Sequence, residues 1–153
     1  MSISAEFKNR INDLINEEVY SHKVKRSELP KLMGVDYSSL FNAVEYGIIP
    51  TPRITIKMAD YFNVSIPYLL GKSNDEYFSK SKSNETFADR TQLLCKEKNV
   101  TPGFVCKECN FYPGYLTRWI KNGYIPSWEF LDILADYFDV TPDYLLGRTD
   151  DRN

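Results

Sequence analysis

The stretch ADYFNVSIPYLLG (Ala59–Gly71) returns 76 residues later as ADYFDVTPDYLLG (Ala135–Gly147). The similarity extends upstream, because residues 34–71 and 110–147 are identical at 13 of 38 aligned positions. Self-similarity at a fixed offset is the signature of a repeated structural unit. The sequence therefore predicts two homologous copies of one fold rather than a single larger domain.

The two copies differ in length near their N-terminal ends. There the offset becomes 80, which aligns Phe7 with Phe87. Copy one thus carries four additional residues before Val24, about one turn of helix, and we expect them inside a longer first helix. The polar, serine-rich segment between the copies is typical of a linker. We predict a first domain over 1–71, a linker over 72–85 and a second domain over 86–153.

The apolar periodicity predicts helices at the start of each copy. Phe7, Ile11 and Leu14 are spaced i, i+4 and i+7, which places them on one face of a first helix. In copy two, Thr101 before Pro102 is the pattern of an N-cap followed by the first helical residue. In copy one we expect Ser27 to cap the second helix, with Pro30 at the third helical position, where its missing N–H costs little.

Three more helices are predicted in each copy, and no strand-like alternation competes with them. The third helix is expected over 36–46 and 112–122, ending near Tyr46–Gly47 and Asn122–Gly123, where glycine or asparagine can take the left-handed cap. The fourth opens at Thr51–Pro52 and Ser127–Trp128, and the fifth begins after Ser65 or Thr141 and closes on Gly71 or Gly147. We therefore expect an all-α protein with five helices per copy.

Composition limits the classes of function. The chain has 153 residues, 42% of them hydrophobic, which suffices for packed cores, and no apolar run approaches the roughly 18 residues of a membrane span. A net charge of −2 argues against a protein that coats nucleic acid through bulk positive charge. The N-terminal residues lack the apolar core of a secretory signal, and three cysteines are an odd number. We expect a cytoplasmic protein with reduced thiols and no membrane partner.

The segment CKEC (Cys106–Cys109) has the C-x-x-C spacing of zinc and redox sites. A structural zinc site takes four ligands, and only Cys95 and the distant His22 remain as candidates. A redox site needs an exposed thiolate of low pKa. We favour core packing against the third helix over redox chemistry and over metal binding. Because the chain has a single histidine and no recognisable nucleophile–base pair, we expect no enzyme activity, no catalytic or metal site and no cofactor.

The second and third helices, joined by the turns MGVD and CNFY, are typical of a helix-turn-helix. Together with the L-x-x-A/W-V/I pattern of the third helix and the YLLG ending, they resemble the Cro/C1-type helix-turn-helix domains of phage repressors and bacterial regulators, over roughly 7–71 and 87–147. The resemblance implies two tandem, lambda repressor-like domains of five helices each. Members usually pair an arginine of the first helix with a glutamate of the third. Here those positions are Cys95 and Ile120 in copy two, and an apolar residue opposite Val44 in copy one, so we expect apolar packing instead.

The resemblance also implies a surface for double-stranded DNA. In a helix-turn-helix the third helix enters the major groove, and its exposed residues reach base edges. Basic residues just before the second helix are expected to contact phosphates. The outward face of the third helix also includes Phe41 and Glu45 in copy one and Pro113 and Gly114 in copy two. The predicted DNA-contacting set is Lys23, Lys25, Arg26, Tyr37, Ser38, Asn42, Thr117, Arg118 and Lys121.

The two third helices differ in charge. Segment 36–46 carries Asp36, Glu45 and no base, whereas 112–122 carries Arg118, Lys121 and no acid. Because DNA attracts positive charge, we expect copy two to make the main base contacts in a sequence-specific transcriptional regulator, either a repressor or a phage-type switch. The alternative is a protein-interaction module, in which one or both copies use the outward aromatic residues Tyr37, Phe41 and Tyr115 to hold a partner protein instead of DNA. The candidate partners are double-stranded DNA, a partner protein and a homodimer.

Overall fold

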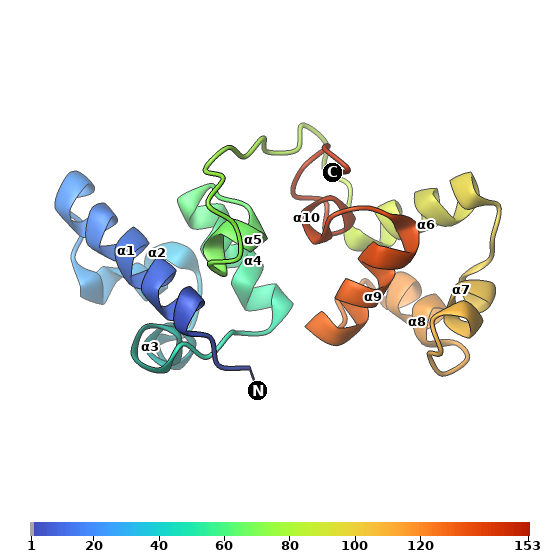
Figure 1. The fold of residues 1–153 in the computed structure, drawn as a ribbon, viewed down its shortest axis with the longest axis horizontal. Helices are drawn as coiled ribbons and strands as arrows, with labels where there is room; N and C mark the ends of the chain where they lie inside the picture. The colour runs from blue at the N-terminus through green and yellow to red at the C-terminus, as the bar shows by residue number, and fades with distance from the viewer. Residues whose placement is uncertain (1) are drawn as a thin grey trace. The chain divides into compact units, whose positions relative to one another are not determined.

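The computed structural model describes residues 2–153, so Met1, the first residue of the domain predicted over 1–71, lies outside the described residues. Residues 2–153 form ten α-helices, one 3₁₀ turn and an isolated bridge between Ile3 and Ile48, with no strand (Figure 1). The all-α prediction is confirmed. The chain divides into two compact units between Phe78 and Ser79, inside the segment that we predicted as a linker.

Each unit contains five α-helices in matching order. The first unit consists of α1 (Ala5–His22), a 3₁₀ turn η1 (Arg26–Glu28), α2 (Leu29–Met33), α3 (Tyr37–Tyr46), α4 (Pro52–Phe62) and α5 (Ile66–Leu69). The second consists of α6 (Phe87–Lys98), α7 (Pro102–Glu108), α8 (Tyr115–Asn122), α9 (Trp128–Phe138) and α10 (Pro142–Leu145). α1 has 18 residues and α6 has 12, and they end at aligned positions. The four additional residues of copy one therefore lie within α1, as predicted.

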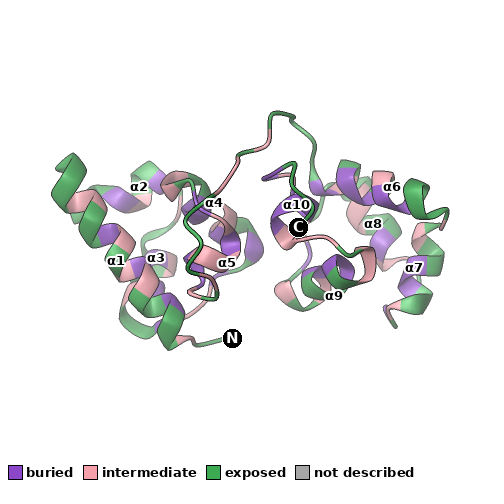
Figure 2. Ribbon diagram, turned by 45° about the horizontal axis from the view of Figure 1, so that its top comes forward, coloured by how far each residue is buried: buried purple, intermediate pink, exposed green. Residues whose placement is uncertain are grey.

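Buried apolar side chains from the inward faces of the helices form a separate core in each unit (Figure 2). α1 packs on α3 and α5, and α6 packs on α7, α8 and α10. Burial of one such side chain contributes about 1.5–3 kcal/mol. The fully or almost fully buried set includes Phe7, Ile11, Met58 and Leu69 in the first unit and Leu94, Leu116, Leu134 and Leu145 in the second.

The repeated YLLG ending is held by an arginine from the first helix of each unit. Arg10 donates from Nη1 to the Tyr68 carbonyl at 2.7 Å, and its guanidinium carbon lies 3.9 Å from the centre of the Tyr68 ring. Arg90 makes the same two contacts with Tyr144, at 3.2 and 4.2 Å. Charged donors and cation–π contacts of this kind are among the stronger polar interactions. The arginine and tyrosine identities between the copies therefore have a structural cause.

The glycine that closes YLLG lies too near another part of the backbone to carry a side chain. Gly71 and Gly147 have φ values of 73° and 77°, in the left-handed region that glycine enters without strain. A Cβ at Gly71 would lie 2.5 Å from the Glu6 carbonyl oxygen, and one at Gly147 would lie 2.1 Å from that of Glu85. Both copies thus need glycine here for conformation and for space.

Both ends of the segment predicted as a linker are folded onto a unit. In the first unit, Arg10 donates to the Ser73 carbonyl at 3.1 Å and to Asn74 Oδ1 at 3.0 Å. In the second, the Thr149 hydroxyl donates to the Ser79 carbonyl at 2.7 Å, and Ser81 Oγ donates to Asp150 Oδ1 at 2.7 Å. The prediction of a linker over 72–85 did not anticipate these contacts, because their partners lie far away in the sequence.

The second helix opens differently in the two units. Thr101 caps α7 as predicted, because its side chain accepts a hydrogen bond from the Phe104 N–H. The aligned residue of copy one is Lys25, which has no acceptor, and the chain makes the uncapped 3₁₀ turn η1 before α2 begins at Leu29. The predicted Ser27 cap is therefore wrong, and Pro30 is the second residue of α2 rather than the third helical residue.

Candidate nucleic-acid interface

The third helix of the first unit begins where the sequence predicts. Asp36 is the N-cap of α3, because its carboxylate accepts hydrogen bonds from the Ser39 N–H at 2.9 Å and the Ser39 hydroxyl at 2.7 Å. The same two bonds hold the pKa of Asp36 below its usual value, since they favour the charged form. The connection from α2 spans only residues 34–36, with Gly34 in the left-handed conformation.

The third helix of the second unit begins three residues later than predicted. Tyr112 aligns with Asp36 but cannot act as a cap, and the chain instead forms a turn in which the Tyr115 N–H donates to the Tyr112 carbonyl at 3.2 Å. Gly114 has φ 86° and directly precedes α8. Pro113 and Gly114 therefore belong to a six-residue connection, 109–114, and not to the helix. The predictions of a short turn at CNFY and of a third helix that begins at residue 112 are therefore wrong.

The outward face of α3 is aromatic and acidic. Tyr37, Phe41 and Tyr46 are 68%, 40% and 58% exposed, and the rings of Tyr37 and Phe41 are stacked with centroids 5.7 Å apart. Ser38 and Glu45 are also exposed, as predicted, whereas Asn42 is half-buried. Apart from Glu45, α3 has no charged residue, and its N-cap adds a second acid.

The outward face of α8 is basic. Thr117, Arg118 and Lys121 are exposed, and neither cation has an ion-pair partner in residues 2–153. The Arg118 guanidinium carbon lies 5.3 Å from the centre of the Tyr115 ring, which supports the side chain from one side. α8 therefore presents two cations in adjacent turns and no acid.

Aromatic rings of α8 pack against aromatic rings from neighbouring segments of the second unit. Trp119 on α8 lies 5.8 Å from Phe111 and 5.1 Å from Phe130, and Tyr115 lies 5.5 Å from Trp119, in each case between ring centroids. Aromatic pairs at such distances contribute about 0.5–1.5 kcal/mol each beyond their buried area. The exposed side chains of α8 therefore project from a well-supported helix.

The predicted phosphate-contacting residues lie together between α1 and α2. Lys23 is the left-handed C-cap of α1, with φ 55°, and both Lys23 and Lys25 are exposed. Arg26 is exposed as well, and its Nη2 donates to Asn16 Oδ1 on α1. The nine predicted residues thus form three groups, of which two, the α1–η1 segment and α3, lie in the first unit and one, α8, lies in the second.

The cysteines lie in the core of the second unit. Cys95 and Cys106 are buried, and Cys106 Sγ accepts a hydrogen bond from the Leu116 N–H at 3.4 Å, while Cys109 is half-buried. Burial raises the pKa of the Cys95 and Cys109 thiols, which opposes formation of a reactive thiolate. The predicted core packing is confirmed for Cys95 and Cys106. Within residues 2–153, no three potential ligands are grouped to hold a metal ion, and no helix is long and apolar enough to cross a membrane.

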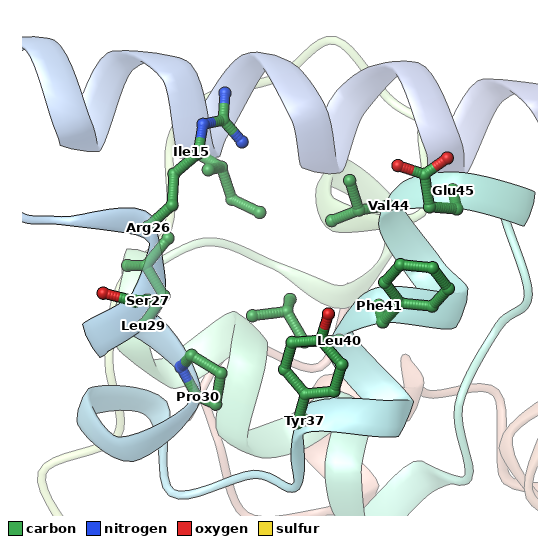
Figure 3. A pocket seen from close by; sticks show the side chains of 10 residues that line it. All are labelled: Ile15, Arg26, Ser27, Leu29, Pro30, Tyr37, Leu40, Phe41, Val44 and Glu45. Atoms are coloured by element: carbon green, nitrogen blue, oxygen red, sulfur yellow. The ribbon is translucent and has the colours of Figure 1, made fainter.

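A pocket beside α3 was not predicted from the sequence. It has a volume of about 400 Å³ and lies between α1, the η1–α2 segment and α3 (Figure 3). Val44 faces it opposite Ile15, so the position that we expected to be apolar is indeed apolar. The only signal in the sequence was the outward placement of aromatic residues on the third helix. The lining residues are Ile15, Arg26, Ser27, Leu29, Pro30, Tyr37, Leu40, Phe41, Val44 and Glu45.

Comparison with protein-family models, with curated proteins and with solved structures gives no match for this chain. Two surfaces therefore carry the functional argument: the basic face of α8, and the aromatic, acidic face of α3 with its adjoining pocket. They occupy equivalent positions in the two copies, yet they differ in charge and in chemistry.

Proposed function

We propose that this chain is a sequence-specific DNA-binding regulator, in which α2–α3 and α7–α8 are the helix-turn-helix pairs of two tandem lambda repressor-like domains. α8 is the main base-contacting helix. The observation that carries the proposal is the charge of the exposed helical pairs. Residues 102–122 carry three bases and one acid, for +2, whereas residues 26–46 carry two bases and three acids, for −1. DNA presents one negative charge per roughly 1.7 Å of its axis, so the α7–α8 pair is matched to it better than the α2–α3 pair, whose nearest added cations are Lys23 and Lys25 before η1.

The chemistry of the α8 face suits base contacts. The Arg118 guanidinium can donate two parallel hydrogen bonds to O6 and N7 of a guanine, which is the commonest specific contact in the major groove. Lys121 lies one turn further along α8 and supplies a point charge for a phosphate. Thr117 lies next to Arg118 on the same exposed face and can contact a base edge or a thymine methyl group.

Selection of bound sequences from random duplexes, followed by titration of the selected site, tests this proposal. Arg118→Ala should cost about 1–3 kcal/mol and relax the preference at one base pair. Lys121→Ala should weaken binding to all sequences alike and reduce the salt slope by about one. Lys25→Ala should behave like Lys121→Ala if the first unit also touches phosphates.

The control for this titration is Arg53→Ala, which removes an exposed cation from α4. It should leave both affinity and base preference unchanged. If Asn42→Ala abolishes specific binding and Arg118→Ala does not, the main base contacts come from α3 and the proposal names the wrong unit. Failure to enrich any sequence would count against DNA recognition altogether.

A second function, protein interaction through the first unit, is favoured by the exposed aromatic face of α3. Aromatic residues are enriched at the centres of protein interfaces, whereas an acidic face repels a polyanion. The two functions are compatible, because they use α8 and α3, which belong to different units.

A further inference from the structure

The first unit exposes two aromatic side chains of α3 beside a pocket. Tyr37 and Phe41 form one wall of the pocket beside α3, and its floor is made by the apolar side chains of Ile15, Leu29 and Val44. Figure 3 shows the two rings on the α3 side of the pocket, with Ile15 and Leu29 on the other elements that line it. The floor itself is buried, since Ile15 and Leu29 are almost inaccessible, but exposed aromatic rings are typical of protein interaction sites. We call the surface formed by these five residues the α3 groove.

The second unit shows that the exposed rings are not a by-product of the fold. The residues that align with Tyr37 and Phe41 are Pro113 and Thr117. The aromatic residues that α8 does carry pack internally, as Trp119 does against Phe111 and Phe130. The two rings of α8 are thus half-buried, whereas Tyr37 and Phe41 of α3 are exposed, although the second unit exposes Tyr112 just before α8.

Opposite charges lie at the two ends of the α3 groove. Arg26 lies at the η1 end and Glu45 at the C-terminal end of α3, and both line the pocket (Figure 3). Both are exposed, and neither forms an ion pair with any of the residues 2–153. Arg26 is bonded to the neutral side chain of Asn16, which leaves its charge uncompensated. The groove is thus apolar in the middle, positive at one end and negative at the other.

A surface with this charge distribution is complementary to itself. In a two-fold dimer the same patch faces itself, and a residue i that contacts j is matched by j contacting i. If two α3 grooves meet antiparallel, the positive end of each faces the negative end of the other. A parallel arrangement would instead place like charges together, which costs binding energy.

We propose that the α3 groove binds the α3 groove of a second copy of this chain. In this dimer Tyr37 and Phe41 of each copy cover the apolar floor of the other, and Arg26 faces Glu45 of the second copy. The groove involves one short helix and its neighbours, so the interface is smaller than the roughly 1,600 Å² of a standard complex. We therefore expect a weak, transient dimer. Each dimer carries two α8 helices, and the α3 face is no longer accessible to DNA.

Sedimentation velocity without DNA tests the dimer, over concentrations from about 1 µM to about 1 mM. We expect the mass of the wild-type chain to rise from monomer to dimer over this range. Arg26→Glu and Glu45→Arg should each weaken the dimer by at least about tenfold, because each places like charges opposite one another twice. An equimolar mixture of these two variants should dimerise again, because every facing pair in the mixed dimer is of opposite charge.

Two further variants make the test decisive. Glu17→Arg reverses an exposed acid of α1 that does not line the groove and should dimerise like the wild type. Phe41→Asp should abolish dimerisation, and circular dichroism should show that its helices persist. If the wild-type chain stays monomeric at all these concentrations, the proposal is overturned. The groove would then be expected to bind another protein. A mixture that stays monomeric, or a dimer that survives Phe41→Asp, would overturn the proposal too. Because no DNA is present, none of these outcomes depends on the proposed regulator function.

Discussion

Replacement of Gly147 by alanine should destabilise the second unit far more than the same replacement at Gly123. Both glycines have a left-handed φ, 77° and 64°. Alanine in this region costs about 1–2 kcal/mol, and this penalty is common to the two positions. The surroundings differ, because a Cβ at Gly147 would lie 2.1 Å from the Glu85 carbonyl oxygen, whereas one at Gly123 would have no neighbour within 4 Å.

The size of the additional penalty follows from what the new methyl group would displace. Ordinary contact with a Cβ begins at 3.4 Å, so the backbone at Glu85 must move by about 1.3 Å. Glu85 directly precedes Thr86, whose side chain and that of Asp89 form the capping box of α6. Its carboxylate also lies 3.5 Å from Arg90 Nε. Loss of a cap costs about 1 kcal/mol, and disturbed hydrogen bonds to a charged group cost more. We expect a total of at least about 3 kcal/mol for Gly147→Ala.

Tryptophan fluorescence during urea unfolding measures this loss in the second unit alone. The chain has two tryptophans, Trp119 and Trp128, and both lie in that unit. The measurement therefore avoids the problem that a two-domain chain has no single free energy of unfolding. The midpoint should fall modestly in Gly123→Ala and steeply in Gly147→Ala.

Equal losses in the two variants would refute this reasoning, because they would show that conformation alone decides the need for glycine. Gly71→Ala is the matched control in the first unit, where a Cβ would lie 2.5 Å from the Glu6 carbonyl oxygen. It should leave the tryptophan transition unchanged while reducing the stability measured by circular dichroism. A shifted tryptophan transition in Gly71→Ala would mean that the units do not unfold independently.

Two other predictions concern the second unit's tail and the boundary between the units. Hydrogen bonds from the Ser81 hydroxyl and the Lys82 N–H, together with Arg90, hold the pKa of Asp150 below its usual 3.8. The resulting stability is present above the usual pKa and is lost as the pH falls below it, so Asp150→Asn should reduce the acid dependence of the tryptophan transition. If the acid dependence is unchanged, other carboxylates account for the loss of stability at low pH. Limited proteolysis should cut between Asn74 and Ser79 and leave two folded fragments, whereas cuts spread through both units would contradict the independence of the units.

The sequence predicts those features of the fold that depend on neighbouring residues. Thr101, Ser65 and Thr141 cap their helices as expected, because a cap needs only a side-chain acceptor and an N–H group three residues away. The expectations fail where one copy has lost the acceptor. Lys25 and Tyr112 stand at positions where the other copy has a cap, and there the helix starts in another way or three residues later.

Features that join distant segments could not be predicted. The pocket beside α3 exists because Ile15, Leu29 and Phe41 come from three different segments and leave space between them. Similarly, the Ser81 hydroxyl donates to Asp150, 69 residues away, which holds the end of the expected linker on the second unit. Helical periodicity gave the exposed faces of the third helices, but it could not show which of their exposed rings lie beside a cavity.

The distribution of identities between the copies separates what the fold needs from what the surfaces do. Nine of the thirteen residues in Ala59–Gly71 recur in Ala135–Gly147, where the arginine contacts and the glycine leave little choice. Between 36–46 and 112–122 a single residue recurs, Leu40 as Leu116, and it is buried in both units. The exposed residues of the third helix have no packing partner to preserve, so they are free to differ in charge and in ring content. One fold can therefore present a basic face on α8 and an aromatic, acidic face on α3 within the same chain, and this difference is the reason for proposing a different partner for each face.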